Sequence, residues 1–200
     1  MKKLFIYFFT IAITFTAKAQ TDFSGYLATA KTSYTSGKLE DAHFALQQAM
    51  QEIDMVVGKE VLKILPQKLN ALNLNPKEDH VMANTSFIGA TISRSYGADT
   101  SGAKIEIINN SPMITYLNSI LNMPVLGGLM RDENNKTLKV QGYKARLEKQ
   151  PNANNEKATY ILNIPLNTAL VTFTVKSSTE PEVMNYINGI PLQQIAKLVN

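Results

Sequence analysis

The spacing of apolar residues changes once along this chain, and that change constrains the fold more than any other feature. From Phe23 to Leu65 the apolar positions recur at helical intervals. Beyond the segment Pro66 to His80, apolar and polar residues alternate, as they do in a half-buried β-strand. The pattern therefore predicts an N-terminal helical part followed by a part that contains a β-sheet.

Two helices account for the N-terminal part. The first apolar stripe runs from Phe23 to Tyr34 and is broken at Ser36-Gly37, where glycine tolerates the left-handed conformation that follows a helix end. The second runs from about Leu39 to Leu65, and Pro66 ends it. Alanines recur on both stripes, which allows the two helices to approach closely.

Residues 26–54 resemble a single tetratricopeptide repeat, because Tyr34, Gly37, Ala42 and Ala49 stand at the spacings of that family. A solenoid of such repeats needs about three copies to bury a continuous core, and this chain contains no second copy. We therefore expect an isolated α-helical hairpin that packs on the domain after it, rather than a peptide-binding solenoid.

The second part of the chain contains several stretches with strand character. They are "SFIGATISRSY", "AKIEIIN", "KTLKVQGYKARLEK", "TYILNIPL" and "ALVTFTVKS". Short turns between them favour antiparallel pairing, and Gly142 suggests a bulge in the third stretch. Ser111 and Thr179 are placed to cap two helices. We predict an α+β fold, in which the N-terminal helical hairpin packs on an antiparallel sheet of about five strands flanked by helices.

The run from Gly142 onward resembles the C-terminal half of secreted domains of the Mog1/PsbP-like type. The resemblance rests on a "GYKARL" strand, a strand ending in "IPL", an "ALVTFTV" strand and a final helical segment "IPLQQIAKL". It implies a central antiparallel sheet flanked by helices. It also implies a non-enzymatic binding or assembly factor, and it carries over no catalytic residue.

The N-terminus has the composition of a secretory signal. Lys2 and Lys3 precede the apolar run Leu4 to Thr16, and Ala17-Lys18-Ala19 supplies the small residues that signal peptidase accepts. We expect cleavage before Gln20 and a protein of the periplasm or the extracellular space. The expected organisation is a signal peptide at 1–19, the helical hairpin at 20–66, a linker at 67–80 and the α+β domain at 81–200.

Removal of the signal lowers the net charge. The chain has 20 basic and 16 acidic residues, and three lysines leave with the signal, so the mature charge is 17 − 16 = +1. This small charge gives no support to nucleic-acid binding, which needs clustered Lys and Arg. The chain also has no cysteine, so no disulfide can stabilise the exported fold.

Reactive groups are scarce in this sequence. Cysteine chemistry is impossible, and only His43 and His80 could serve as the base of a serine triad. We expect His43 on the hairpin and His80 in the linker, away from any nucleophile elbow. The histidines are also too far apart in sequence to suggest a zinc site. We therefore expect no catalytic residue, no metal, no cofactor and no enzymatic activity.

One segment is unusually apolar for a loop. "NMPVLGGLM" contains two glycines and a proline, and its apolar members are Met123, Pro124, Val125, Leu126, Leu129 and Met130. Such a segment either covers the end of the sheet or contacts a partner or a second copy of the chain. We expect a protein- or peptide-binding module of the cell envelope or extracellular space. The alternative is a carrier of an apolar small molecule or lipid.

Overall fold

The computed structural model describes residues 17–84, 89–122, 134–152 and 157–199. The chain forms two compact units, residues 1–52 and residues 53–200, and the division falls inside a helix. Within the described ranges, no helix is both long enough and apolar enough to cross a membrane.

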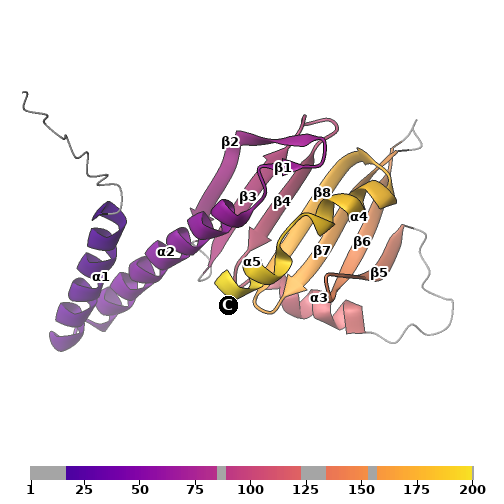
Figure 1. The fold of residues 1–200 in the computed structure, drawn as a ribbon. Helices are drawn as coiled ribbons and strands as arrows, with labels where there is room; N and C mark the ends of the chain where they lie inside the picture. Colours follow the sequence, from indigo (N-terminus) through magenta and orange to yellow (C-terminus); the bar gives the residue numbers. More distant parts are fainter. Residues whose placement is uncertain (1–16, 85–88, 123–133, 153–156, 200) are drawn as a thin grey trace, which may run out of the picture. The chain divides into compact units, whose positions relative to one another are not determined.

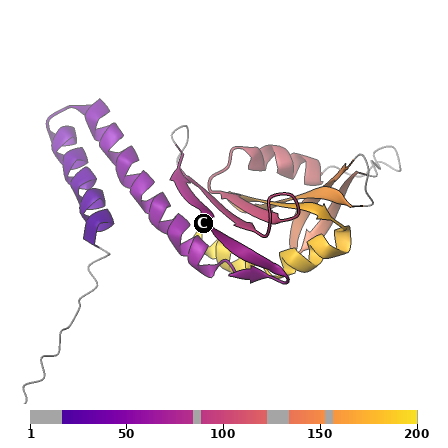
Figure 2. The same cartoon turned by 90° about the horizontal axis from the view of Figure 1, so that it is seen from above.

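The first unit contains helix α1 (Ala17–Thr35) and the first half of α2 (Leu39–Ile64), which lie side by side (Figures 1 and 2). Gly37 adopts a φ of 75° at the turn, and the Lys38 N–H donates to the Ser33 carbonyl at 2.9 Å. Glycine adopts this left-handed conformation without a steric penalty, which explains why the first helix stops there. The predicted pair of N-terminal helices is confirmed.

The second unit is built on one antiparallel sheet with the strand order β1-β2-β3-β4-β8-β7-β6-β5 (Figure 1). Its strands are β1 (Lys68–Leu69), β2 (Leu72–Ala83), β3 (Ala90–Tyr96), β4 (Ala103–Ile108), β5 (Asn135–Val140), β6 (Tyr143–Pro151), β7 (Ala158–Leu166) and β8 (Ala169–Ser178). Its further helices are α3 (Met113–Asn122), α4 (Glu180–Asn188) and α5 (Leu192–Leu198). The predicted α+β class is confirmed.

The predicted number of strands is wrong, because the described sheet has eight strands rather than about five. The predicted connection from Pro66 to His80 contains β1 and most of β2. Its proline and asparagine fall where the pairing of β2 with β3 slips, between Asn75 and His80. A strand near the edge of a sheet tolerates proline at such an irregularity. The composition of this segment is typical of a turn, and for that reason the sequence predicted a linker where the structure has a strand.

The predicted bulge at Gly142 is also wrong. Gln141 and Gly142 both have positive φ, 49° and 92°, and Val140 lies opposite Tyr143 in the ladder. Two successive positive φ values are the mark of a two-residue type I′ hairpin turn. The stretch that we expected to be one strand is therefore the hairpin β5–β6.

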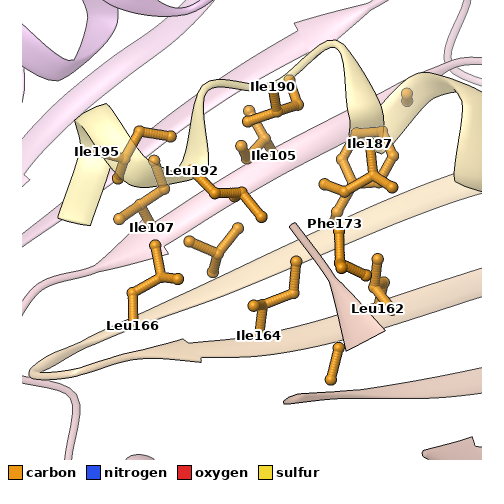
Figure 3. Close-up of a cluster of buried hydrophobic side chains, with 14 of the residues drawn as sticks. Ile105, Ile107, Leu162, Ile164, Leu166, Phe173, Ile187, Ile190, Leu192 and Ile195 are labelled. Carbon is orange, nitrogen blue, oxygen red and sulfur yellow. The ribbon is translucent and has the colours of Figure 1, made fainter. Parts of the chain in front are cut away.

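Helices cover the two faces of the sheet unequally. Helices α4 and α5 lie on one face and α3 on the other (Figure 2). Ile187, Ile190, Leu192 and Ile195 join the same buried cluster as Ile105, Ile107, Leu162 and Phe173 of the sheet (Figure 3). Helix α3 contributes Leu117 and Leu121 to a smaller cluster with Leu170. We call the face under α4 and α5 the core face, and the opposite one the open face.

The helix termini follow the sequence closely. Glu182 accepts the Thr179 N–H at 2.8 Å, as the predicted capping box of α4 requires, and it also accepts a hydrogen bond from the Thr179 hydroxyl at 3.0 Å. Ser111 Oγ accepts the Met113 N–H at 3.4 Å at the start of α3. These helix starts are fixed by local residues, because the donors and acceptors are only a few positions apart.

A buried arginine fixes the C-terminal end of α2 to the sheet. Arg94, which is 4% exposed, donates from Nε and Nη2 to the two carboxylate oxygens of Asp79, at 3.0 and 2.6 Å. Its Nη1 donates to the Leu65 carbonyl at 2.8 Å, and the Tyr96 hydroxyl donates to the Pro66 carbonyl at 2.9 Å. Carbonyls at a helix end have no partner within the helix, so these two side chains supply one.

Burial and the contact between Arg94 and Asp79 set the pKa values in this cluster. Burial raises the pKa of Tyr96 to about 12. Burial also opposes the charge of Arg94, but the hydrogen bonds and charge of Asp79 outweigh it, and the pKa of the guanidinium is raised. The Arg94 guanidinium is therefore charged at every pH at which the protein would be studied.

We predict that Arg94→Met destabilises the second unit by about 3–5 kcal/mol, because it leaves the Asp79 carboxylate and the Leu65 carbonyl without their donor. Lys104→Met is the matched control, since Lys104 pairs with Glu106 at 3.2 Å in solvent and should cost under about 1 kcal/mol. Urea unfolding measures both. Equal losses for the two variants would contradict the prediction.

A second buried charge lies in the part of α2 that belongs to the second unit. Asp54 is 7% exposed, and its Oδ2 has no hydrogen-bond partner among the described residues. Burial raises the pKa of its carboxyl, and a hydrogen bond from the Gly89 backbone N–H opposes that shift in part. The ionised form therefore costs stability in the folded state, and the protonated form does not.

We predict that Asp54→Asn stabilises the protein at pH 7 by about 1 kcal/mol, because it removes a buried unpaired charge and keeps an oxygen for Gly89. The pKa of the Asp54 carboxyl is higher in the folded than in the unfolded protein. The free energy of unfolding of the unaltered protein therefore falls as the pH rises through the folded pKa of Asp54. The gain should therefore shrink as the pH falls towards about 4. Thermal melts of both chains from pH 4 to 8 test this, and a gain independent of pH would contradict it.

Candidate functional site

A groove of about 490 Å³ lies on the open face of the sheet. Among the described residues, helix α3 packs mainly over β6, β7 and β8 of this face, and the groove lies over the β2–β4 part. The groove is lined by side chains of β2, β3, β4 and β8 and by the turn from Gly97 to Gly102; the polar ones on the strands are Glu78, His80, Ser93, Ser95, Lys104, Thr174 and Lys176. We call it the sheet groove.

The strand register aligns the polar side chains in rows across the sheet. Lys104 lies opposite Ser95 on one side and Thr174 on the other. The next row places Ser93 opposite His80, with Glu106 on the far side of Ser93. Because side chains alternate between the two faces of a strand, the residues between them point into the core.

Two irregularities of the sheet border the groove. In β2, the register slips between Asn75 and His80, which directs Asp79 to Arg94 while Glu78 and His80 line the groove. In β8, Ser177 has a φ of 49° next to Lys176, and its hydroxyl donates to the Thr100 carbonyl at 3.2 Å. Bulges of this kind redirect side chains at sheet edges and next to binding sites.

Glycine is required at the rim of the groove. A Cβ on Gly102 would lie 2.3 Å from the Tyr96 carbonyl oxygen and 2.5 Å from that of Ala98. Both neighbours are backbone atoms, so the turn cannot make room without moving. This close approach brings the turn from Gly97 to Gly102 against the end of β8, where the Lys176 N–H donates to the Gly102 carbonyl at 3.0 Å.

Charges of both signs occur in and beside the sheet groove. Lys176 donates to Asp99 at 2.8 Å, and this hydrogen bond and charge lower the pKa of the Asp99 carboxyl. Asn75 donates to Glu78 at 2.9 Å. The groove therefore offers hydrogen-bond donors and acceptors with little net charge, and it does not concentrate one sign of potential.

The two histidines lie in different units. His43 is exposed on α2, as expected. His80 was expected in a linker, but it lies on β2 opposite Ser93. Within the described ranges, no hydrogen bond joins His80 to Ser93 or Ser95, and no cluster of three His, Asp or Glu side chains could hold a metal ion. The groove thus places His80 beside Ser93 on neighbouring strands.

The apolar segment proposed from sequence as a partner site cannot be placed. Met123, Pro124, Val125, Leu126, Leu129 and Met130 all lie in the range 123–133, outside the described residues. Its role as a partner surface stays a prediction. The alternation of apolar and polar residues in "SFIGATISRSY" and "AKIEIIN" places Ser93, Ser95 and Lys104 on outward strand faces. Nothing in the sequence indicates that they share a groove with Thr174 and Lys176.

Comparison with known proteins gives no relative. No protein-family model matches the chain, and neither a curated protein nor a solved structure matches it. The resemblances to a tetratricopeptide repeat and to Mog1/PsbP-like domains stay predictions from the sequence.

Proposed function

We propose that this chain is an exported, non-enzymatic module that binds a protein or peptide segment in the sheet groove. The observation that carries the proposal is the lining of the groove, which combines hydroxyl, amine, carboxylate and imidazole side chains from β2, β3, β4 and β8. A polypeptide segment presents N–H donors, carbonyl acceptors and side chains of both charges, and so matches such a lining. The resemblance of the C-terminal run to Mog1/PsbP-like domains implies the same class of function.

A carrier of an apolar small molecule or lipid is the weaker alternative. Such a carrier needs a cavity lined mainly by apolar side chains. In the described residues, the apolar side chains between the sheet and α4 and α5 pack on one another, and Ile105, Ile107, Leu162 and Phe173 are wholly buried. The sheet groove is lined instead by a mixture of polar side chains and small apolar residues such as Ala98 and Ala103. Native mass spectrometry of the chain purified from its host would detect a bound lipid if the alternative holds.

Export is part of the proposal, and it rests on the signal-like N-terminus. We predict that the chain isolated from its host begins at Gln20 and is recovered from the envelope or medium fraction. N-terminal peptide mass spectrometry measures this. Replacing the small residue Ala19 with arginine should leave the precursor uncleaved, whereas Thr21→Arg should not. A chain that retains Met1 in the cytoplasmic fraction would contradict export.

We predict that a photo-crosslinking amino acid at Ser95 in the groove captures a polypeptide in the host. The matched control carries the same group at Gln194, which is exposed on α5 on the opposite face of the sheet. Adducts at Ser95 should be lost when Lys104→Glu reverses a charge of the groove, and the fold should persist since Lys104 is exposed. Equal adducts at both positions, or none at Ser95, would overturn the proposed site.

A further inference from the structure

The helical hairpin has its large apolar side chains on the outside. In the described part of residues 22–52, the buried apolar side chains are all alanines, on α1 at Ala30 and on α2 at Ala42, Ala45 and Ala49. Among the large ones, Phe23 and Tyr26 are half-buried and Phe44 is exposed. Five others are exposed, at 41% for Leu27, 69% for Tyr34, 63% for Leu39, 47% for Leu46 and 42% for Met50. We call these five the hairpin surface. A two-helix unit with an alanine core buries too little apolar area to be stable by itself.

Helix geometry places the hairpin surface on one side of the hairpin. Leu27 and Tyr34 are two turns apart on α1, and Leu39 and Leu46 are two turns apart on α2. At 100° per residue, the stripe is rotated from the alanines of its own helix by about 50° on α1 and about 90° on α2, in the same sense. The two helices are antiparallel, so rotations in the same sense bring both stripes to the same side.

The spacing on α2 selects a helix as the occupant. Leu39, His43, Leu46 and Met50 follow one another at intervals of four, three and four residues. This is the a/d repeat along which another helix packs by inserting side chains between them. The exposed apolar area is on the order of 500 Å², comparable with the largest apolar patch of a typical monomer, and would give a weak interface by itself.

Charge complementarity indicates which helices face each other across the interface. Lys31 lies at the outer edge of the hairpin surface on α1, and Glu40 lies at its outer edge on α2. Both side chains are exposed, and neither joins an ion pair among the described residues. Lys31 is six residues before Gly37 and Glu40 is three after it. Their heights along the hairpin therefore differ by only about 5 Å. A two-fold rotation that sets α1 against α2 of another hairpin brings each Lys31 beside a Glu40.

We propose that the hairpin surface is covered by the same surface of a second copy of this chain, so that two hairpins form an antiparallel four-helix bundle. The bundle buries Leu27, Tyr34, Leu39, Leu46 and Met50 of both copies, and it is bordered by two Lys31–Glu40 pairs between copies. This interface is separate from the sheet groove, and it does not depend on the proposed peptide binding.

Sedimentation velocity of the purified chain, over about 1 to 200 µM, measures the monomer–dimer equilibrium. We expect a concentration-dependent dimer for the unaltered chain and a monomer for Leu46→Glu. Phe44→Glu is the matched control, because Phe44 is 61% exposed but lies on the other side of α2, and it should dimerise normally. Circular dichroism checks that each variant is folded. A monomer throughout the range, or equal loss in the two variants, overturns the proposal.

Charge reversal tests whether the partner is a second copy of this chain or a different helical protein. Lys31→Glu and Glu40→Lys should each weaken the dimer by about 5- to 10-fold, because each puts like charges together twice. When the two variants are mixed, both inter-copy pairs become attractive, so a heterodimer should form with the affinity of the unaltered chain. Failure of the mixture to recover, while either variant alone is weakened, would show that Lys31 and Glu40 do not meet across a two-fold axis.

Discussion

The ion pair between Arg94 and Asp79 is the interaction on which the second unit depends. It joins the slipped segment of β2, the centre of β3 and the end of α2 through one buried side chain. A buried guanidinium is costly unless it is paired and hydrogen-bonded, and here a bidentate carboxylate and a helix-end carbonyl accept three hydrogen bonds from it. The pair therefore selects one register for β2, because a slip by one residue would move Asp79 to the opposite face.

That register also creates the sheet groove. With Asp79 directed to the core face, Glu78 and His80 point to the open face, beside Ser93. The core face is apolar and covered by α4 and α5, and the open face is polar and covered by α3 over only part of its width. An antiparallel sheet can be solvated on one side in this way. A ligand could therefore bind to the polar face without displacing apolar side chains of the core.

The two units bury different kinds of apolar side chain. The second unit buries large aliphatic side chains between sheet and helices, and Ile164, Leu166 and Phe173 are wholly enclosed. The first unit buries alanines, because small side chains allow its two helices to approach closely. Its larger apolar groups stay outside as a result. The close approach that makes the hairpin compact is therefore the reason that it presents a surface for another helix.

The sequence by itself determined the features that depend on neighbouring residues. Gly37 and Pro66 bounded the two N-terminal helices, Thr179 and Glu182 set the start of α4, and alternation identified both faces of β3 and β4. Each of these follows from contacts within a few positions along the chain. The turn at Gln141-Gly142 was misread as a bulge because glycine is compatible with both, and only the pairing of β5 with β6 distinguishes them.

Only the tertiary structure decided which strands are neighbours. Alternation shows that Lys104 and Thr174 face outward, but it does not show that β4 lies beside β8, seventy residues later. The strand character of β2 likewise comes from its pairing with β3 and from the Arg94–Asp79 contact, since Pro76 and the asparagines around it are typical of a turn. The sheet groove is made of such long-range neighbours. Hydrogen bonds between distant strands leave no periodic signal in the sequence, so the groove had to be found in the fold.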